Sequence, residues 1–320
     1  MITKKFIPAL SAFALAVAAL AGCANPAVED KAATPDAAKE SAVEAGGPID
    51  AEAFDALVAG GATASDEEIA ASEWATKVKE AGTLRVGTTA TSYLFSQQDE
   101  TDQKLRGFDA GLYQLLTRYI LGDESKFEFT QLDSGTREQV LQTNVVDVVV
   151  ATYSITPERE EVISYAGPYY TSRQGILVSA DNGEIMGLED LAGKNVATQA
   201  ESTGPAILAE FAPDAVVQEF GTDQEARTAV EQGRVDAYVT DATLIANSIV
   251  KDPGKYKLVG EPFGPEDNYG IGLPKDSDGV QFVNDFLKKI EADGTWAELW
   301  KLSIGDRSGI TEVPAPPAIG

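Results

Sequence analysis

Short apolar runs of strand length alternate along the chain with stretches whose apolar positions follow a helical period. In the first half, the strand-like runs cover residues 84–88, 127–132 and 145–150. A helical stripe, spaced by three and four residues, is formed by Leu112, Leu115, Leu116 and Tyr119. Alternation of this kind is typical of a parallel sheet flanked by helices. We therefore expect an α/β fold that begins near residue 83.

The same alternation resumes after about residue 175. The expected strands are 176–178, 196–198, 216–220 and 235–240, with extended chain again near 268–274. The expected helices of this part are 203–211, 222–232, 242–249, 278–292 and 296–302, and one further helix, 136–142, is expected in the first half. Thr222 and Glu225 have the spacing of a capping box that opens one of these helices. A chain of 320 residues with 43% hydrophobic content is long enough for two lobes.

Two segments echo each other, one in each half. Residues 142–147 and 231–236 each end in Asp beside a buried strand, and five residues after each Asp stands a polar residue, Thr152 or Asp241. In open α/β sheets the carboxyl ends of the strands face the ligand crevice. We therefore predict two lobes across a cleft. The expected bounds are 65–171 for lobe 1, 172–267 for lobe 2 and 268–306 for the return to lobe 1.

The N-terminus has the pattern of an export signal. Lys4 and Lys5 precede an apolar stretch, 6–20, that is interrupted by Pro8 and followed by small residues. The motif Leu20-Ala21-Gly22-Cys23 resembles a bacterial lipobox, and Cys23 is the only cysteine. We predict a signal peptide over 1–22, a lipid anchor on Cys23, and an acidic flexible tether over 23–64. Residues 50–58 are expected to form a short helix, and Ser65 and Glu68 have the spacing of a capping box that opens a second helix. A Pro-rich tail, 307–320, is expected to be disordered from Val313.

Charge and composition exclude several classes of function. The formal charge is −26 and the chain has no histidine. An acidic surface does not suit nucleic acid, and the absence of imidazole removes Ser-His-Asp triads and most zinc sites. We expect no nucleic-acid partner, no metal, no cofactor and no catalytic residue.

Arg159 has an unusual position. Thr156 is a suitable N-cap, Pro157 suits the first helical position, and a cation in the first turn opposes the helix dipole. One interpretation is a solvated pair with Glu160 or Glu161. The other places Arg159 in a cleft, where it holds a ligand carboxylate beside Thr152 and Ser154. The residues alone favour neither.

The order of residues around Arg159 adds information. Asp147 and the run Ser154-Ile155-Thr156-Pro157-Glu158-Arg159 are followed by Tyr165-Ala166-Gly167-Pro168-Tyr169-Tyr170. This pattern resembles the ligand-site segment of bacterial extracellular solute-binding proteins of the polar amino-acid class, the receptors of ABC importers. The resemblance runs from about 82 to 302. It implies a two-lobed fold of the type II periplasmic-binding-protein kind, with a hinge and an interlobe cleft.

The resemblance also implies roles for individual residues. Arg159 would grip the ligand α-carboxylate, Ser154 and Thr152 would add hydrogen bonds, and Thr203 would reach the same group from the opposite lobe. Asp241 would bind the ammonium. The alternative for Asp241 is a plain helix N-cap. Thr203 has the same plain alternative, although for this residue capping and ligand binding are compatible.

Side-chain selectivity depends on Ser134 and Arg137, which resemble the Ser-x-x-Arg of glutamate- and aspartate-binding members. Arg137 could instead be a surface residue paired with Glu138 or Asp133. Members that bind acidic ligands often carry a second cation after the first strand, where this chain has Thr88 or Thr89. Glutamine or asparagine therefore stays an alternative ligand.

The expected function is a lipid-anchored, monomeric substrate-binding protein of an ABC amino-acid importer, with a permease and an ATPase as partners. Glutamate is the first candidate and glutamine the second. The alternatives are a dehydratase-like enzyme on the same fold and an amino-acid sensory ectodomain.

Overall fold

The computed structural model describes residues 46–320. The predicted signal peptide, Cys23 and the first part of the predicted tether therefore lie outside the described residues. Among the helices of residues 46–320, none combines the length and the apolar character needed to cross a membrane.

An eight-stranded sheet organises the described chain, in the order β5-β1-β6-β11-β7-β10-β8-β9. One half holds the parallel strands β1 (Leu84–Thr88), β5 (Phe127–Gln131) and β6 (Val148–Val149). The other half holds β8 (Asn195–Gln199), β9 (Val216–Phe220) and β10 (Ala237–Asp241), also parallel. We call the half with β1, β5 and β6 lobe 1, and the half with β8, β9 and β10 lobe 2. Both halves match the predicted strands closely.

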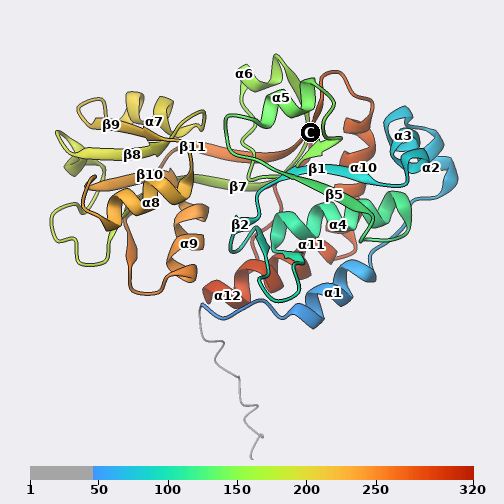
Figure 1. Cartoon of the computed structure of the whole chain (residues 1–320), viewed down its shortest axis with the longest axis horizontal. Helices are drawn as coiled ribbons and strands as arrows, with labels where there is room; N and C mark the ends of the chain where they lie inside the picture. Colours follow the sequence, from blue (N-terminus) through green and yellow to red (C-terminus); the bar gives the residue numbers. More distant parts are fainter. Residues whose placement is uncertain (1–45) are drawn as a thin grey trace, which may run out of the picture. The chain divides into compact units, whose positions relative to one another are not determined.

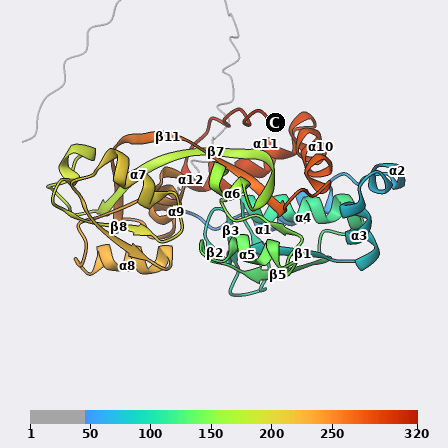
Figure 2. The same cartoon turned by 90° about the horizontal axis from the view of Figure 1, so that it is seen from above.

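Two long antiparallel strands run through both lobes (Figures 1 and 2). They are β7 (Ile163–Ser179) and β11 (Tyr256–Pro274). Only 176–178 and 268–274 were predicted as extended there, so the length of both strands is a correction. The bounds expected for lobe 2, residues 172 and 267, are register partners on these strands. The lobe bounds themselves stay predictions.

The helices pack on the faces of each lobe. Lobe 1 contains α4 (Phe108–Leu121), α5 (Arg137–Gln142), α6 (Pro157–Glu160), α10 (Gly279–Ala292) and α11 (Thr295–Trp300), which continues into a π-helical turn at Lys301–Gly305. Lobe 2 contains the 3₁₀ turn Leu188–Leu191, α7 (Gly204–Phe211), α8 (Asp223–Glu231) and α9 (Ala242–Lys251). A three-stranded sheet of β2 (Thr91–Ser92), β3 (Ser96–Gln98) and β4 (Leu105–Arg106) was not predicted.

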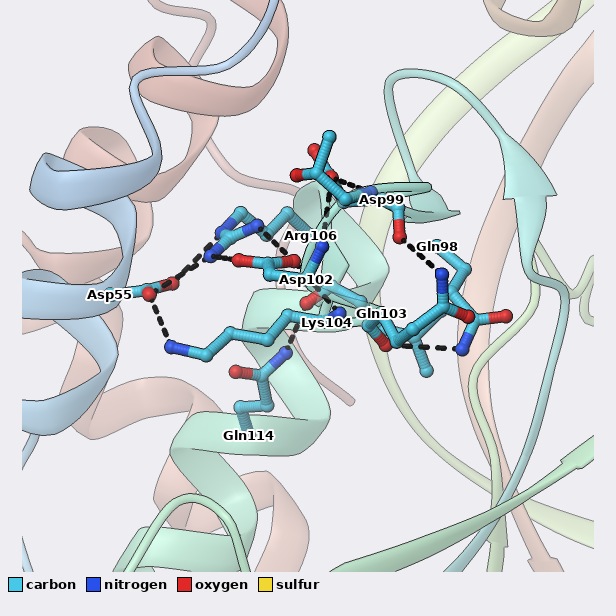
Figure 3. A network of polar contacts seen from close by, with 10 residues as sticks. Asp55, Gln98, Asp99, Asp102, Gln103, Lys104, Arg106 and Gln114 are labelled. Carbon is cyan, nitrogen blue, oxygen red and sulfur yellow. Dashed lines mark hydrogen bonds and ion pairs between the residues drawn. The ribbon is translucent and has the colours of Figure 1, made fainter.

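The N-terminal part of the chain corrects the predicted tether. Residues 46–64 contain α1 (Ala51–Ala59), and α2 (Asp66–Ala70) and α3 (Glu73–Ala81) follow. Phe54 and Val58, four residues apart on α1, are buried in the core of lobe 1. Asp55 pairs with Arg106 at 2.9 Å and with Lys104 at 2.6 Å (Figure 3). The short helix expected over 50–58 is therefore present as α1, whereas the bound of 64 for the tether is wrong, because an apolar helix face outweighs the acidic composition of this stretch.

The C-terminal tail is a second correction. After α12 (Asp306–Ser308), Val313 and Ile319 pack against the core of lobe 1. The Gly320 backbone N–H donates to the Gly167 carbonyl at 3.2 Å. Apolar residues on either side of the prolines give the tail contacts that its composition did not indicate, so the expectation of disorder from Val313 is wrong.

We expect Phe54→Ala to lower the free energy of unfolding by about 3–5 kcal/mol, because it opens a cavity in the core of lobe 1. Urea denaturation measures the change. Phe129→Ala is the matched control, because Phe129 on β5 is 38% exposed and loses little burial. Equal losses in both variants would mean that α1 does not belong to the folded core.

Candidate ligand-binding site

A cavity of about 250 Å³ lies between the lobes. Lobe 1 lines it with residues that follow β1, β5 and β6, and lobe 2 with residues that follow β8, β9 and β10. Every binding residue predicted within residues 46–320 lines this cavity: Ser134, Arg137, Thr152, Ser154, Arg159, Thr203 and Asp241. The predicted residues therefore lie together at the carboxyl ends of the parallel strands, where ligands bind in open α/β sheets.

Arg159 lies on α6 and is buried, with 9% exposure. Its Nη1 donates to the Ser154 carbonyl at 2.8 Å, and its Nη2 donates to the Glu201 carbonyl at 3.0 Å. Its Nε lies 3.3 Å from a carboxylate oxygen of Glu138. These partners exclude the solvated pair with Glu160 or Glu161. Glu201 belongs to lobe 2, so Arg159 bridges the lobes. Its guanidinium carries more N–H donors than these contacts use.

Arg137, the first residue of α5, is also buried and contacts no carboxylate within ion-pair distance in the described chain. Its guanidinium lies 4.3 Å from the centre of the Tyr153 ring, which Arg159 also contacts, at 5.1 Å. Burial, with the nearby charge of Arg159, lowers the pKa of Arg137. The alternative of a surface residue paired with Glu138 or Asp133 is therefore wrong. Two cations share one side of the cavity.

The backbone of Thr152 is held in place by a hydrogen bond to Asp109. Its φ is +42°, in the left-handed region that non-glycine residues rarely adopt, and its N–H donates to Asp109 Oδ2 at 2.8 Å. Asp109 Oδ1 accepts from the Tyr169 hydroxyl at 2.9 Å. Gly107, just before α4, has no room for a side chain, because a Cβ would lie 2.5 Å from the Phe95 carbonyl oxygen. Asp109 thus fixes the loop that carries Thr152.

Ser134 and Ser154 complete the lobe 1 side of the cavity. Both are buried, with 8% and 5% exposure. The Ser154 backbone carbonyl accepts hydrogen bonds from Arg159 and from the Tyr165 hydroxyl. These bonds fix the backbone of Ser154, which lines the cavity. Ser134 lies in the turn before α5, next to Arg137.

On lobe 2, neither Thr203 nor Asp241 caps its helix through its side chain. The Gly204 N–H of α7 is instead satisfied by Ser202 Oγ at 3.1 Å. Asp241 accepts hydrogen bonds from Gln174 Nε2 and from the Tyr269 hydroxyl. Burial, with the charge of Asp267, raises the pKa of Asp241 to about 7. The plain N-cap alternatives are therefore wrong, because neither side chain makes a capping hydrogen bond.

Several polar residues of the cavity were not predicted, and two of them, Gln174 and Asn247, are buried side chains with contacts across the site. Gln174 lies within β7, and Asn247 lies on α9. Asn247 Oδ1 accepts the Leu94 backbone N–H at 2.7 Å, which joins lobe 2 to lobe 1. A polar side chain beside the apolar run 175–178 was the available signal for Gln174. For Asn247, a buried amide on a helix gives no comparable signal.

Stability is expected to depend on pH through Asp109. Burial raises its pKa to about 7, against 3.8 for the free side chain. The folded state then binds more protons than the unfolded state between these values. The contribution of Asp109 is fully present below about pH 3.8 and is lost as the pH rises through about 7.

We therefore expect Asp109→Asn to reduce the difference in unfolding free energy between pH 5 and pH 8, measured by urea denaturation at each pH. An asparagine keeps an acceptor for the Thr152 N–H. Identical pH dependence in variant and parent would show that Asp109 is already ionised in the folded state at pH 5.

No group of three His, Cys, Asp or Glu side chains within residues 46–320 is placed to hold a metal ion. The cavity offers cations on one lobe and a carboxylate on the other, both buried and partly free of protein partners. Such an arrangement can bind a small molecule that carries both charges.

Comparison with known proteins agrees with the fold. The chain is 32% identical over 226 residues to the glutamine-binding protein GlnH of an ABC transporter from Bacillus subtilis, covering 70% of this chain and 82% of that protein. It is 32% identical over 226 residues to the glutamate-binding protein GluB of Corynebacterium glutamicum, covering 67% of this chain and 76% of that protein.

A solved structure is also similar. An ancestral arginine-binding protein bound to glutamine superposes with a TM-score of 0.63 at 35% identity, over 70% of this chain and 99% of that one. The predicted two-lobed, type II periplasmic-binding-protein-like fold is confirmed. Residues 84–304 match the family described as bacterial extracellular solute-binding proteins, family 3. This chain belongs to that family.

Proposed function

We propose that the chain binds a polar amino acid between its lobes and delivers it to the permease and ATPase of an ABC importer. One observation carries this proposal. Arg159 and Asp241, a buried cation and a buried acid from opposite lobes, line the same cavity. A free amino acid carries the complementary carboxylate and ammonium on one carbon, so it satisfies both lobes at once.

Glutamate is the first candidate ligand and glutamine the second. The buried guanidinium of Arg137 contacts no carboxylate in the described chain, which favours a ligand with a side-chain anion. Thr89 lines the cavity where a second cation would strengthen that preference. The names of the relatives support both ligands, because one is a glutamine-binding and another a glutamate-binding protein.

Isothermal calorimetry of the chain against a full panel of amino acids tests the proposal. We expect one or a few polar amino acids to bind, glutamate most tightly. The absence of heat with every amino acid would overturn the proposal.

A second candidate, an enzyme on the same fold, is favoured by one observation. Asp241 has a pKa near 7, as a general acid or base would. Incubating each bound amino acid with the chain and analysing for products separates the two functions. The binding protein returns its ligand unchanged, whereas an enzyme yields a product.

We also propose that the chain acts outside the cytoplasm as a monomer, held at the membrane by lipid on Cys23. The sequence Leu20-Ala21-Gly22-Cys23, after a charged and apolar leader, supports this. Stable anchoring takes two or more acyl chains.

Cys23→Ala is expected to release the chain from membranes, because no thiol remains to accept lipid. Cell fractionation measures the distribution, and ligand binding by the released chain shows that it is folded. Continued retention in the membrane fraction would contradict the anchor.

A further inference from the structure

Gln174 occupies a central position at the cavity. It lies on β7, is 2% exposed and lines the cavity beside Asp241. Its Nε2 faces three oxygen acceptors: Asp241 Oδ1, Thr203 Oγ1 at 3.3 Å and Asp267 Oδ2 at 3.5 Å. The amide nitrogen is therefore committed to oxygen atoms of lobe 2 and of β11.

These contacts determine the orientation of the amide. The reversed orientation would place Oε1 against the oxygens of two carboxylates and would leave these acceptors without the two N–H donors of the amide. The amide oxygen must therefore face away from the acids. In the described chain, Gln174 Oε1 is buried and accepts no hydrogen bond. A buried acceptor without a partner costs about 1–3 kcal/mol, so the site gains when a donor arrives.

The two acids also lack a compensating charge. Asp241 and Asp267 are both buried, and neither forms an ion pair with a Lys or Arg of residues 46–320. Their donors are neutral: Gln174 from β7, the Tyr269 hydroxyl from β11 and the Thr203 hydroxyl from the start of α7. Two carboxylates that share a buried site cannot both ionise without a cation.

We infer that Gln174 is a ligand-binding residue that presents Oε1 to the α-ammonium of the amino acid while its Nε2 holds Asp241 and Asp267 toward the same charge. This inference rests on the proposed function. An ammonium carries several N–H donors, so it can contact Asp241 and Gln174 Oε1 together. In the empty site, a proton on Asp241 takes the place of the cation.

Proton release follows from this arrangement. When the ammonium enters, the proton on Asp241 leaves for the solvent, because one cation replaces the other. The charged and titratable groups that face the pair are Tyr269 on β11 and, at longer range, Arg137 on α5. Below about pH 7, binding should therefore release about one proton. The affinity should then fall by up to about tenfold for each unit by which the pH is lowered.

The test compares Gln174→Met with the parent chain by calorimetry, with L-glutamate, L-glutamine and glutarate as probes. Glutarate has the carboxylates of glutamate but no ammonium. We expect the variant to bind both amino acids at least about tenfold more weakly, the equivalent of 1.4 kcal/mol. Binding of glutarate should change by less than about threefold.

Gln114→Met is the matched control. Gln114 is a buried amide on α4 that donates to the Leu105 carbonyl at 2.8 Å and does not line the cavity. Amino-acid affinity within about threefold of the parent is expected for this variant. An equal loss for Gln114→Met would show a general effect of losing a buried amide, and would overturn the inference.

The failures of the two proposals are distinguishable. If the parent binds no amino acid, the proposed function fails, and this inference with it. If the parent binds and Gln174→Met binds within about threefold of it, only this inference fails. Should Gln174→Met not fold, Gln174→Leu, which also lacks the amide oxygen, is titrated with the same probes. The same loss for both amino acids supports the inference, and binding within about threefold of the parent overturns it.

Discussion

Arg159→Ala is expected to weaken binding of every amino-acid ligand by about thirty- to several-thousand-fold. The α-carboxylate is common to all amino acids, and loss of one partner from a buried charge pair costs about 2–5 kcal/mol. Arg159 also donates to the Glu201 carbonyl of lobe 2, so the variant loses an interlobe hydrogen bond as well as a ligand contact. Calorimetry with each ligand found for the parent measures the loss. Asp241→Ala should give a loss of the same order from the ammonium end.

Two further variants sharpen the result for Arg159. Arg159→Lys keeps the charge but loses the planar fork, so it should recover only part of the affinity. Arg234→Ala is the matched control, because Arg234 is an exposed cation that contacts the Phe220 ring outside the cavity. A loss below about threefold in Arg159→Ala would mean that the ligand carboxylate is bound elsewhere.

Most strands and helices were predictable because their apolar pattern is local. β9 has the predicted bounds 216–220, and the predicted helical stripe of Leu112 to Tyr119 lies on α4. The long strand β7 was not predictable over its first part, because residues 163–174 mix a Gly-Pro pair with polar side chains. There, pairing with β11 over a long register determines the conformation, and such pairing leaves no local pattern.

The predicted end of the tether and the predicted disorder of the tail were wrong for a different reason. Composition predicts disorder when a stretch contains few large apolar residues. On α1, however, Phe54 and Val58 stand four residues apart, which is enough to bury one helix face. In the tail, Val313 and Ile319 use a surface that lobe 1 provides. Whether such a surface exists is a property of the folded lobe and cannot be read from the segment itself.

The site was predictable where its residues follow strands. Thr152 comes shortly after β6 and Asp241 is the last residue of β10, so both lie at the carboxyl ends of strands, and the order of residues around Arg159 is specific. Gln174 escaped because it lies inside a strand, where a polar side chain usually faces solvent. Its burial beside Asp241 and Asp267 depends on the pairing of β7 with β10 and β11, which brings these residues together only in the folded chain.

Arg137→Gln separates glutamate from glutamine as the ligand. The parent holds a buried guanidinium against Tyr153, with a weak contact of 3.4 Å to the Ala151 carbonyl and no acid to compensate its charge. A glutamate side chain would supply that acid, whereas glutamine offers a neutral carbonyl of similar shape. We expect glutamate affinity to fall by at least about thirty-fold and glutamine affinity to change by less than about threefold, both measured by calorimetry.

Thermal unfolding of the ligand-free variant distinguishes a binding role from a structural one. Burial already lowers the pKa of Arg137, so its charge is not stabilised by the empty protein. Removing it should leave the melting temperature unchanged or raise it. Arg85→Gln is the matched control, because Arg85 pairs with Asp147 outside the cavity and its loss should not affect either ligand. If Arg137→Gln binds both ligands as the parent does, Arg137 does not contact the ligand. The preference for an acidic amino acid would then have no physical basis in this cavity, because Arg159 already serves the α-carboxylate.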